Sequence, residues 1–259
     1  MRSVRAALAF VALSVPACAH VPTFLSTHDA VDPPPRHVLF VADGAGDYRA
    51  CSTHLRDTVH ADGLPLDVVT FVWSHGYLRN FADHNDYAFA RLRGRELAER
   101  IIDQRQSRPD LPVSLVGHSA GCGVVLAAAE QLPPDTIDRI VLLSPSVSAD
   151  YDARPALRVA RLGIDNFYSP EDWLWLGLFI ELVGAMDDSS TTRTAGRYGF
   201  TIVTQDPVDE PLWSKLRQHR WAPDHQTLGH DGQHYGCYQP DHLRRFVLPL
   251  FEAGSISDQ

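Results

Sequence analysis

The sequence predicts an α/β fold: a three-layer α/β/α sandwich in which helices cover both faces of a mostly parallel sheet of about six strands. Two observations predict it. From residue 37 onward, short apolar runs rich in β-branched residues alternate with segments of helical periodicity. The chain has 259 residues and 44% hydrophobic content, which suffices for one large core. We therefore expect a single folded domain over residues 37–259.

Each element follows from its own pattern. The expected strands are the apolar runs at residues 37–41, 66–73, 113–118, 137–144, 163–168 and 200–204. A helix between residues 85 and 104 has a narrow face that can lie close on a sheet, formed by Ala90, Gly94, Leu97 and Ile101. The closing helix repeats its apolar residues at helical spacing from Leu243 to Phe251, and Pro249 should kink it.

One expected strand ends in a serine between two glycines, Gly117-His118-Ser119-Ala120-Gly121, and a helix of small residues follows. This G-x-S-x-G pattern between strand and helix is typical of a nucleophile elbow. The turn is sharp enough that a Cβ atom at either glycine would collide, and it strains the serine backbone. Ser119 Oγ is thereby exposed at the start of the helix, whose N–H groups and dipole can stabilise an anion. The structural alternative is a tight turn with an idle serine.

With this elbow, the sequence from residue 37 resembles the α/β-hydrolase superfamily, in particular its small cutinase-like or lipase-like members. The resemblance implies that an acid and then a histidine follow the serine along the chain. The acid is expected just after a later strand, at Asp172, with Asp165 and Glu171 as alternatives. Asp172 also suits the N-cap of a helix, and the two roles are compatible. The histidine is expected in the loop before the last helix, at His234, with His230 as the alternative.

The resemblance also implies an oxyanion hole made of two backbone N–H groups. One belongs to Ala120, directly after the serine. The other comes from the loop after the first strand, Ala42-Asp43-Gly44-Ala45-Gly46-Asp47, which resembles a His-Gly-x-Gly loop with aspartate in place of histidine. Ala45 is the expected donor. A tight turn that opens a helix would need the same glycines.

The function that this resemblance implies is hydrolysis of carboxylic esters through an acyl-enzyme, on a small-molecule or lipid ester and without a cofactor. A thioesterase or peptidase would use the same three residues, because pocket shape decides the leaving group. A third hypothesis is a non-catalytic envelope protein that binds ligands on a hydrolase scaffold. Residues 173–183 are apolar all round, which predicts either a buried helix or a cover over an acyl pocket.

No metal site is expected. Four potential ligands lie close in the sequence: His225, His230, Asp231 and His234. Their spacing matches neither H-E-x-x-H nor paired C-x-x-C, and Gly232 disfavours a helix that would align residues four apart. His219 and His225 are instead expected on loop surfaces.

The first 18 residues predict an export signal, because Arg2 and Arg5 precede the apolar stretch 6–15, which is too short to span a bilayer. Ala17-Cys18-Ala19 fits ordinary signal cleavage, whereas residues 15–18 resemble a lipobox in which Cys18 is lipidated. We expect export, either as a secreted protein or as an envelope lipoprotein held at the membrane only through Cys18. Residues 19–36, with three successive prolines, predict a tether.

Charge and cysteine content narrow the possible partners. The formal charge of −9 becomes about −11 when the two signal-peptide arginines are removed, which argues against nucleic-acid binding and leaves no basic patch for anionic lipid. Export permits a disulfide, and Cys51 with Cys237 is the expected pair, since each follows a predicted active-site loop. Cys122 is expected to be a small buried apolar residue.

Overall fold

The computed structural model describes residues 34–173, 176, 185–187, 191–202 and 209–252, all within the compact unit Val31–Gln259. The expected signal peptide, with Cys18, and most of the expected tether lie outside the described residues. So does most of the apolar segment 173–183. Among the described residues, no helix combines the length and the apolar character needed to cross a membrane.

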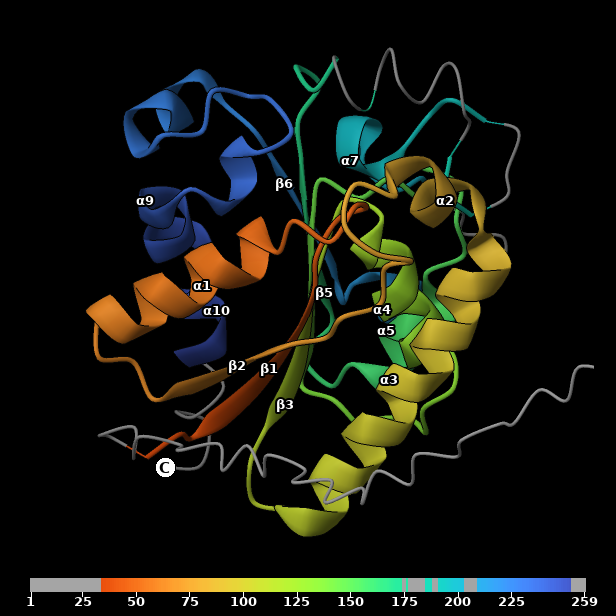
Figure 1. Cartoon of the computed structure of the whole chain (residues 1–259), viewed down its shortest axis with the longest axis vertical. Coiled ribbons are helices and arrows are strands. Elements are labelled where there is room, and N and C mark those ends of the chain that lie inside the picture. Colours follow the sequence, from red (N-terminus) through yellow and green to blue (C-terminus); the bar gives the residue numbers. More distant parts are fainter. Residues whose placement is uncertain (1–33, 174–175, 177–184, 188–190, 203–208, 253–259) are drawn as a thin grey trace, which may run out of the picture. The chain divides into compact units, whose positions relative to one another are not determined.

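One six-stranded sheet forms the centre, in the order β2-β1-β3-β4-β5-β6, and every pairing is parallel (Figure 1). The strands are β1 (His37–Ala42), β2 (Leu66–Thr70), β3 (Val113–His118), β4 (Arg139–Leu143), β5 (Ile164–Tyr168) and β6 (Leu216–Arg220). The predicted sandwich around a parallel sheet of about six strands is confirmed.

The helices are α1 (Ala50–Ala61), α2 (Asn80–Asn85), α3 (Tyr87–Ser107), α4 (Gly121–Ala129), α5 (Arg154–Val159), α7 (Ala195–Tyr198), α8 (Glu210–Trp213), α9 (Pro240–His242) and α10 (Pro249–Glu252). Shorter turns of 3₁₀ or π type are η3 (Pro223–Leu228), η4 (Gly236–Tyr238) and η5 (Leu243–Val247). Figure 1 shows α1 and α10 on one face of the sheet and α3, α4 and α5 on the other.

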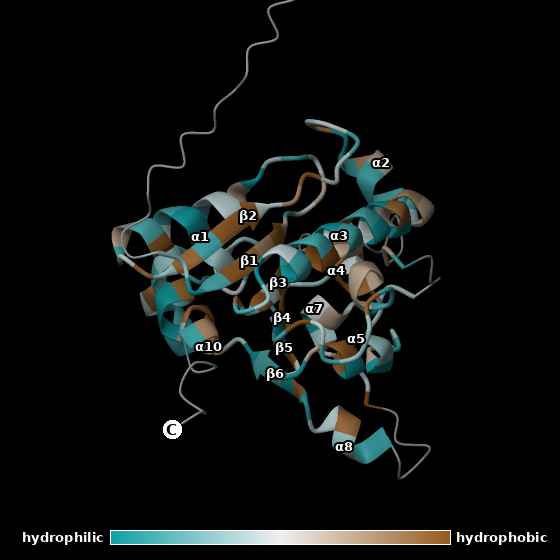
Figure 2. Cartoon of the chain, turned by 90° about the horizontal axis from the view of Figure 1, so that it is seen from below, coloured by the Kyte–Doolittle hydropathy of each residue, from teal (hydrophilic) through white to brown (hydrophobic). Residues whose placement is uncertain are grey.

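Strand β1 shows why both faces of the sheet are buried. Val38 and Phe40 belong to one apolar cluster, with residues of α3 and α4, whereas Leu39 and Val41 belong to a second cluster, with residues of α1 and α10. Alternate side chains of a strand point to opposite faces, so a continuous apolar run fits a sheet covered on both sides. In Figure 2, α3 is largely hydrophilic and α4 hydrophobic, as expected for an outer and an inner helix.

The predicted narrow face of α3 lies against α4. All nine residues of α4 are buried. A Cβ atom at Gly94 would come within 2.8 Å of Ala127 Cβ, so glycine at this position allows the two helices to approach closely.

One predicted strand was placed wrongly. Residues 200–202 form no strand, and residues 203–204 lie outside the described part; the sixth strand is β6. Because β6 is an edge strand beside β5 alone, its Leu-Arg-Gln-His-Arg sequence carries no apolar run. Phe200 is apolar because it packs in the core outside any strand. The closing helix lies where it was predicted, as the succession α9, η5 and α10; Leu248 between the last two has helical backbone, and Pro249 is the first residue of α10.

Candidate active site

The predicted site residues all follow strands at the carboxyl edge of the sheet. Ala45 follows β1, Ser119 follows β3, Asp172 follows β5 and His234 follows β6. In a parallel sheet these ends share one edge, so four segments distant in sequence converge there.

The elbow has the strain that its sequence predicted. Ser119 has a φ of 52°, in the left-handed region that residues other than glycine seldom adopt. A Cβ atom at Gly121 would lie 2.2 Å from Ala42 O, and one at Gly117 would lie 2.7 Å from Cys122 Cα. The two glycines are therefore required by close approach of the backbone.

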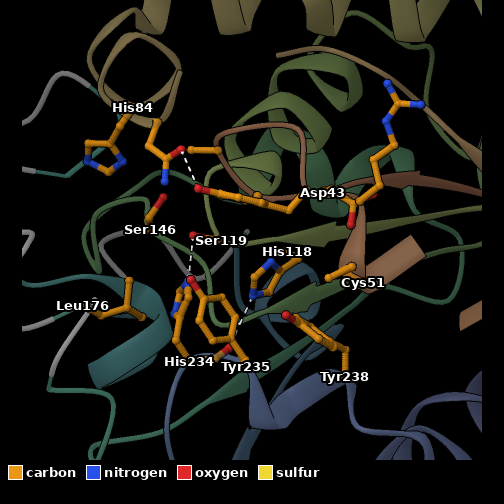
Figure 3. A pocket seen from close by; sticks show the side chains of 16 residues that line it. Asp43, Cys51, His84, His118, Ser119, Ser146, Leu176, His234, Tyr235 and Tyr238 are labelled. Atoms are coloured by element: carbon orange, nitrogen blue, oxygen red, sulfur yellow. Dashed lines mark hydrogen bonds between the residues drawn. The ribbon is translucent and has the colours of Figure 1, made fainter. Parts of the chain in front are cut away.

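Ser119, His234 and Asp172 form a continuous chain of hydrogen bonds. His234 Nε2 lies 2.9 Å from Ser119 Oγ, and His234 Nδ1 lies 2.6 Å from Asp172 Oδ2. Figure 3 shows the Ser119–His234 contact. Asp172 is fully buried, and His234 is 3% exposed. With Nδ1 protonated to donate to the carboxylate, Nε2 presents its lone pair to the serine hydroxyl and can accept its proton.

The alternative acids lie elsewhere. Asp165 is buried in an ion-pair network with Arg139, Arg217 and His219. Burial raises the pKa of Asp165, but the hydrogen bonds from His219 and Arg217 outweigh it and hold that pKa below its usual value. Glu171 is exposed at the surface next to Asp172.

His230, the alternative histidine, has a structural place. Its Nδ1 accepts a hydrogen bond from Gly232 N–H, and its carbonyl accepts one from Trp221 Nε1. Burial lowers the pKa of His230 to about 3, so the ring is neutral. His219 lies in β6 and pairs with Asp165, so its predicted position in a loop was wrong. His225 lies half-buried in η3.

The glycine-rich loop after β1 lies directly against the serine. A Cβ atom at Gly44 would be 3.2 Å from Ser119 Cβ. Within the described part of the chain, the N–H groups of Ala45 and Ala120 donate no hydrogen bond. Both N–H groups are therefore available to a ligand at Ser119.

Asp43 stands where the resemblance leads us to expect histidine. Its Oδ1 accepts a hydrogen bond from Ser52 N–H in the first turn of α1, at 3.0 Å, and its carbonyl accepts one from Trp73 Nε1. Burial raises the pKa of this carboxyl group. Asp43 thus fixes the start of α1 relative to the loop.

A cavity of about 60 Å³ opens at Ser119. Its wall includes hydrogen-bonding side chains that the sequence analysis did not single out: Tyr48, Asn80, Ser146, Tyr235 and Tyr238. Figure 3 labels the last three of these. Ser146 is 1% exposed, and its Oγ has no hydrogen-bond partner among the described residues. Its position soon after β4, at the carboxyl edge, was the one signal in the sequence that could have indicated it.

His118, inside the elbow, packs against His234. Its Nε2 donates to His234 O at 3.3 Å, and its ring centroid lies 4.9 Å from that of His234. Burial lowers the pKa of His118 well below its usual value, so the ring is neutral and adds no charge beside His234.

The predicted pairing of Cys51 with Cys237 is wrong, because both are free thiols. Both are buried in the same apolar cluster, where they pack as small apolar side chains. Cys237 Sγ donates to His234 O, and burial raises its pKa to about 12. Cys122 is buried in α4, as expected. Within the described segments, no three His, Cys, Asp or Glu side chains are arranged to hold a metal ion.

Comparison with known proteins supports the superfamily that the fold and the elbow indicate. No family model matches the chain. It is 27% identical over 176 residues to monoglyceride lipase of Mus musculus, which covers 67% of this chain and 52% of the lipase. Together with the six-stranded parallel sheet and its elbow, this similarity decides the superfamily. The chain is a member of the α/β-hydrolase superfamily.

Other similarities are more distant or shorter. Monoglyceride lipase of Rattus norvegicus is 27% identical over 138 residues, 52% of this chain and 44% of the lipase. This α/β-hydrolase therefore spans about half the length of the curated relatives it matches. Among solved structures, a cutinase-like protein from Cryptococcus sp. aligns at 14% identity with a TM-score of 0.40, over 72% of this chain and 76% of that one.

Proposed function

We propose that this α/β-hydrolase cleaves carboxylic esters through an acyl-enzyme, with Ser119 as nucleophile, His234 as general base and acid, and Asp172 as the residue that orients the histidine. The hydrogen-bond chain from Ser119 Oγ through His234 to Asp172 carries the proposal. A serine hydroxyl is a weak nucleophile until such a base accepts its proton.

The reaction follows from these contacts. Ser119 Oγ attacks the ester carbonyl while its proton passes to His234 Nε2. Asp172 stabilises the imidazolium, and the N–H groups of Ala120 and Ala45 stabilise the oxyanion. His234 then protonates the leaving alcohol. A water molecule, deprotonated by the same ring, releases the acyl group and restores Ser119.

The substrate class and the export of the protein are also proposals. The relatives named monoglyceride lipase support a lipid or other small ester as substrate. Thioester and amide substrates would use the same residues, and parallel assays with matched ester, thioester and amide distinguish the three. Export through residues 1–18, with or without a lipid on Cys18, stays a prediction from the sequence.

Replacement of the nucleophile tests the proposal. Ser119→Ala should abolish hydrolysis of p-nitrophenyl butyrate and covalent labelling by a fluorophosphonate, because it removes the hydroxyl that is hydrogen-bonded to His234 Nε2. Mass-spectrometric mapping should place the adduct of the native protein on Ser119. Ser107→Ala, at an exposed serine that ends α3, is the matched control and should behave as the native protein. Full activity in Ser119→Ala, or a folded native protein that takes no label, would refute the proposal.

A further inference from the structure

The loop that carries Ala45 is held by a buried carboxylate on α2. Asp83 is fully buried, and its two oxygens accept four hydrogen bonds. Oδ2 accepts from Gly46 N–H at 2.7 Å and from Ser74 Oγ at 2.5 Å. Oδ1 accepts from His75 N–H at 2.7 Å and lies 3.0 Å from His75 Nδ1. Hydrogen bonds to an ionised acceptor are short and strong, so Asp83 fixes its donors firmly.

These hydrogen bonds join two strained loops. In the first loop, Gly46 has a φ of 90° and Asp47 a φ of 54°. In the second, Gly76 has a φ of 129° and Leu78 a φ of 63°. Leu78 N–H donates to Gly46 O at 3.1 Å, so Gly46 is held at its N–H by Asp83 and at its carbonyl by the second loop. Strained backbone persists only where its surroundings determine it, and it concentrates at functional sites.

The restraint acts next to the reacting atoms. Gly46 directly follows Ala45, and Gly44 lies against Ser119. An oxyanion donor must lie about 2.7–3.1 Å from the developing charge, so a small shift of this loop would weaken it. Asp83 itself lines no part of the cavity at Ser119.

We propose that Asp83 is a positioning residue of the oxyanion hole, which acts through Gly46 N–H to hold the Ala45 N–H in place for the transition state. The inference rests on the proposed function, and it assigns a role to a carboxylate outside the Ser119, His234 and Asp172 set. If Asp83 has this role, its replacement should destabilise only the states that carry an oxyanion, which are the transition state and tetrahedral adducts of Ser119.

Asp83→Asn tests it, because asparagine keeps the size of the side chain but replaces one accepting oxygen with a donor. With p-nitrophenyl butyrate we expect kcat to fall by about 10–100-fold and KM to stay within about threefold. This fall in kcat is smaller than the fall expected when an oxyanion donor is removed altogether. Affinity for a trifluoromethyl ketone, which forms a tetrahedral oxyanion on serine, should fall by the same factor as kcat/KM. Affinity for butyrate, which forms none, should not change.

Two further variants separate positioning from folding. Asp103→Asn makes the same substitution at an exposed acid of α3 and changes none of the hydrogen bonds of the Gly46 loop; it should keep kcat. Gly46→Ala disturbs the same loop independently, since its Cβ would lie 2.1 Å from Asn80 Oδ1; it should reproduce the kcat loss, and it decides the question if Asp83→Asn does not fold.

The outcomes are distinguishable. If folded Asp83→Asn keeps kcat within twofold, or loses ketone and butyrate affinity equally, the positioning role is wrong while the proposed hydrolase stands. The same holds if Asp83→Asn does not fold and folded Gly46→Ala keeps kcat. If the native protein neither hydrolyses the ester nor binds the ketone, both proposals fall.

Discussion

Ser119 has a strained backbone and lies between two glycines at which a Cβ atom would collide. Its side chain contacts His234, which is more than a hundred residues away in the sequence. The strain and the glycines are local consequences of the G-x-S-x-G turn, so the sequence could indicate them. The partner could be placed only by chain order within a resembled family. Of the two histidines in that loop, His234 meets the serine, whereas His230 points into a packed cluster with His225 and His242.

Asp172→Asn should reduce kcat by about 10⁴-fold with little change in KM, because an amide donor would favour the wrong histidine tautomer. Steady-state kinetics on p-nitrophenyl butyrate measures this. Glu171→Gln alters the exposed acid next to it and should leave kcat unchanged. Equal losses in both variants would show that charge near the site matters instead of the contact with His234 Nδ1.

Among the elements, α4 shows most clearly how one short segment serves both fold and site. It starts directly after Ser119 and Ala120, and it is buried throughout between the sheet and α3. The close contact at Gly94 and Ala127 therefore stabilises the helix whose N-terminus follows Ser119.

Gly94→Val should lower the free energy of unfolding by about 1–3 kcal/mol, because the added side chain has no room against Ala127. Urea denaturation followed by circular dichroism measures the change. Arg95→Val places the same side chain at the next, exposed position of α3, where it makes no such clash, and its cost in helix propensity is only a few tenths of a kcal/mol. Similar destabilisation in both variants would contradict the packing argument.

At the scale of the whole molecule, the parallel sheet brings four loops to one edge, and a second group of histidines packs away from that edge. His230 and His242 are buried with ring centroids 4.8 Å apart. Burial lowers the pKa of His230 to about 3 and that of His242 to about 4. Both rings are therefore neutral in the folded protein at pH values where the unfolded chain already binds protons.

These lowered pKa values make the free energy of unfolding depend on pH. As the pH is lowered from 6.5 to 4, the unfolded state binds more protons than the folded state at these two residues, so the free energy of unfolding should fall by about 2–3 kcal/mol for each of them. Guanidinium unfolding at pH 7 and pH 4.5 measures it. His242→Gln should reduce this pH dependence, whereas His60→Gln, at an exposed histidine, should not. An unchanged pH dependence in His242→Gln would exclude this origin.

The sequence by itself determined the fold class, the elbow and the order of the candidate site residues. These depend on local periodicity, on the steric demand of one turn and on a resembled chain order. The tertiary structure decided what depends on distant partners. It brought His234 and Asp172 into one hydrogen-bond chain with Ser119 and placed His230 and Asp165 elsewhere, and it identified β6, whose polar residues pair with buried Asp165. It also left Cys51 and Cys237 unbonded and revealed the contact between Asp83 and the Gly46 loop. The sequence could not indicate Asp83, because a carboxylate can be buried only where hydrogen-bond donors surround it, and those donors come together only when the chain is folded.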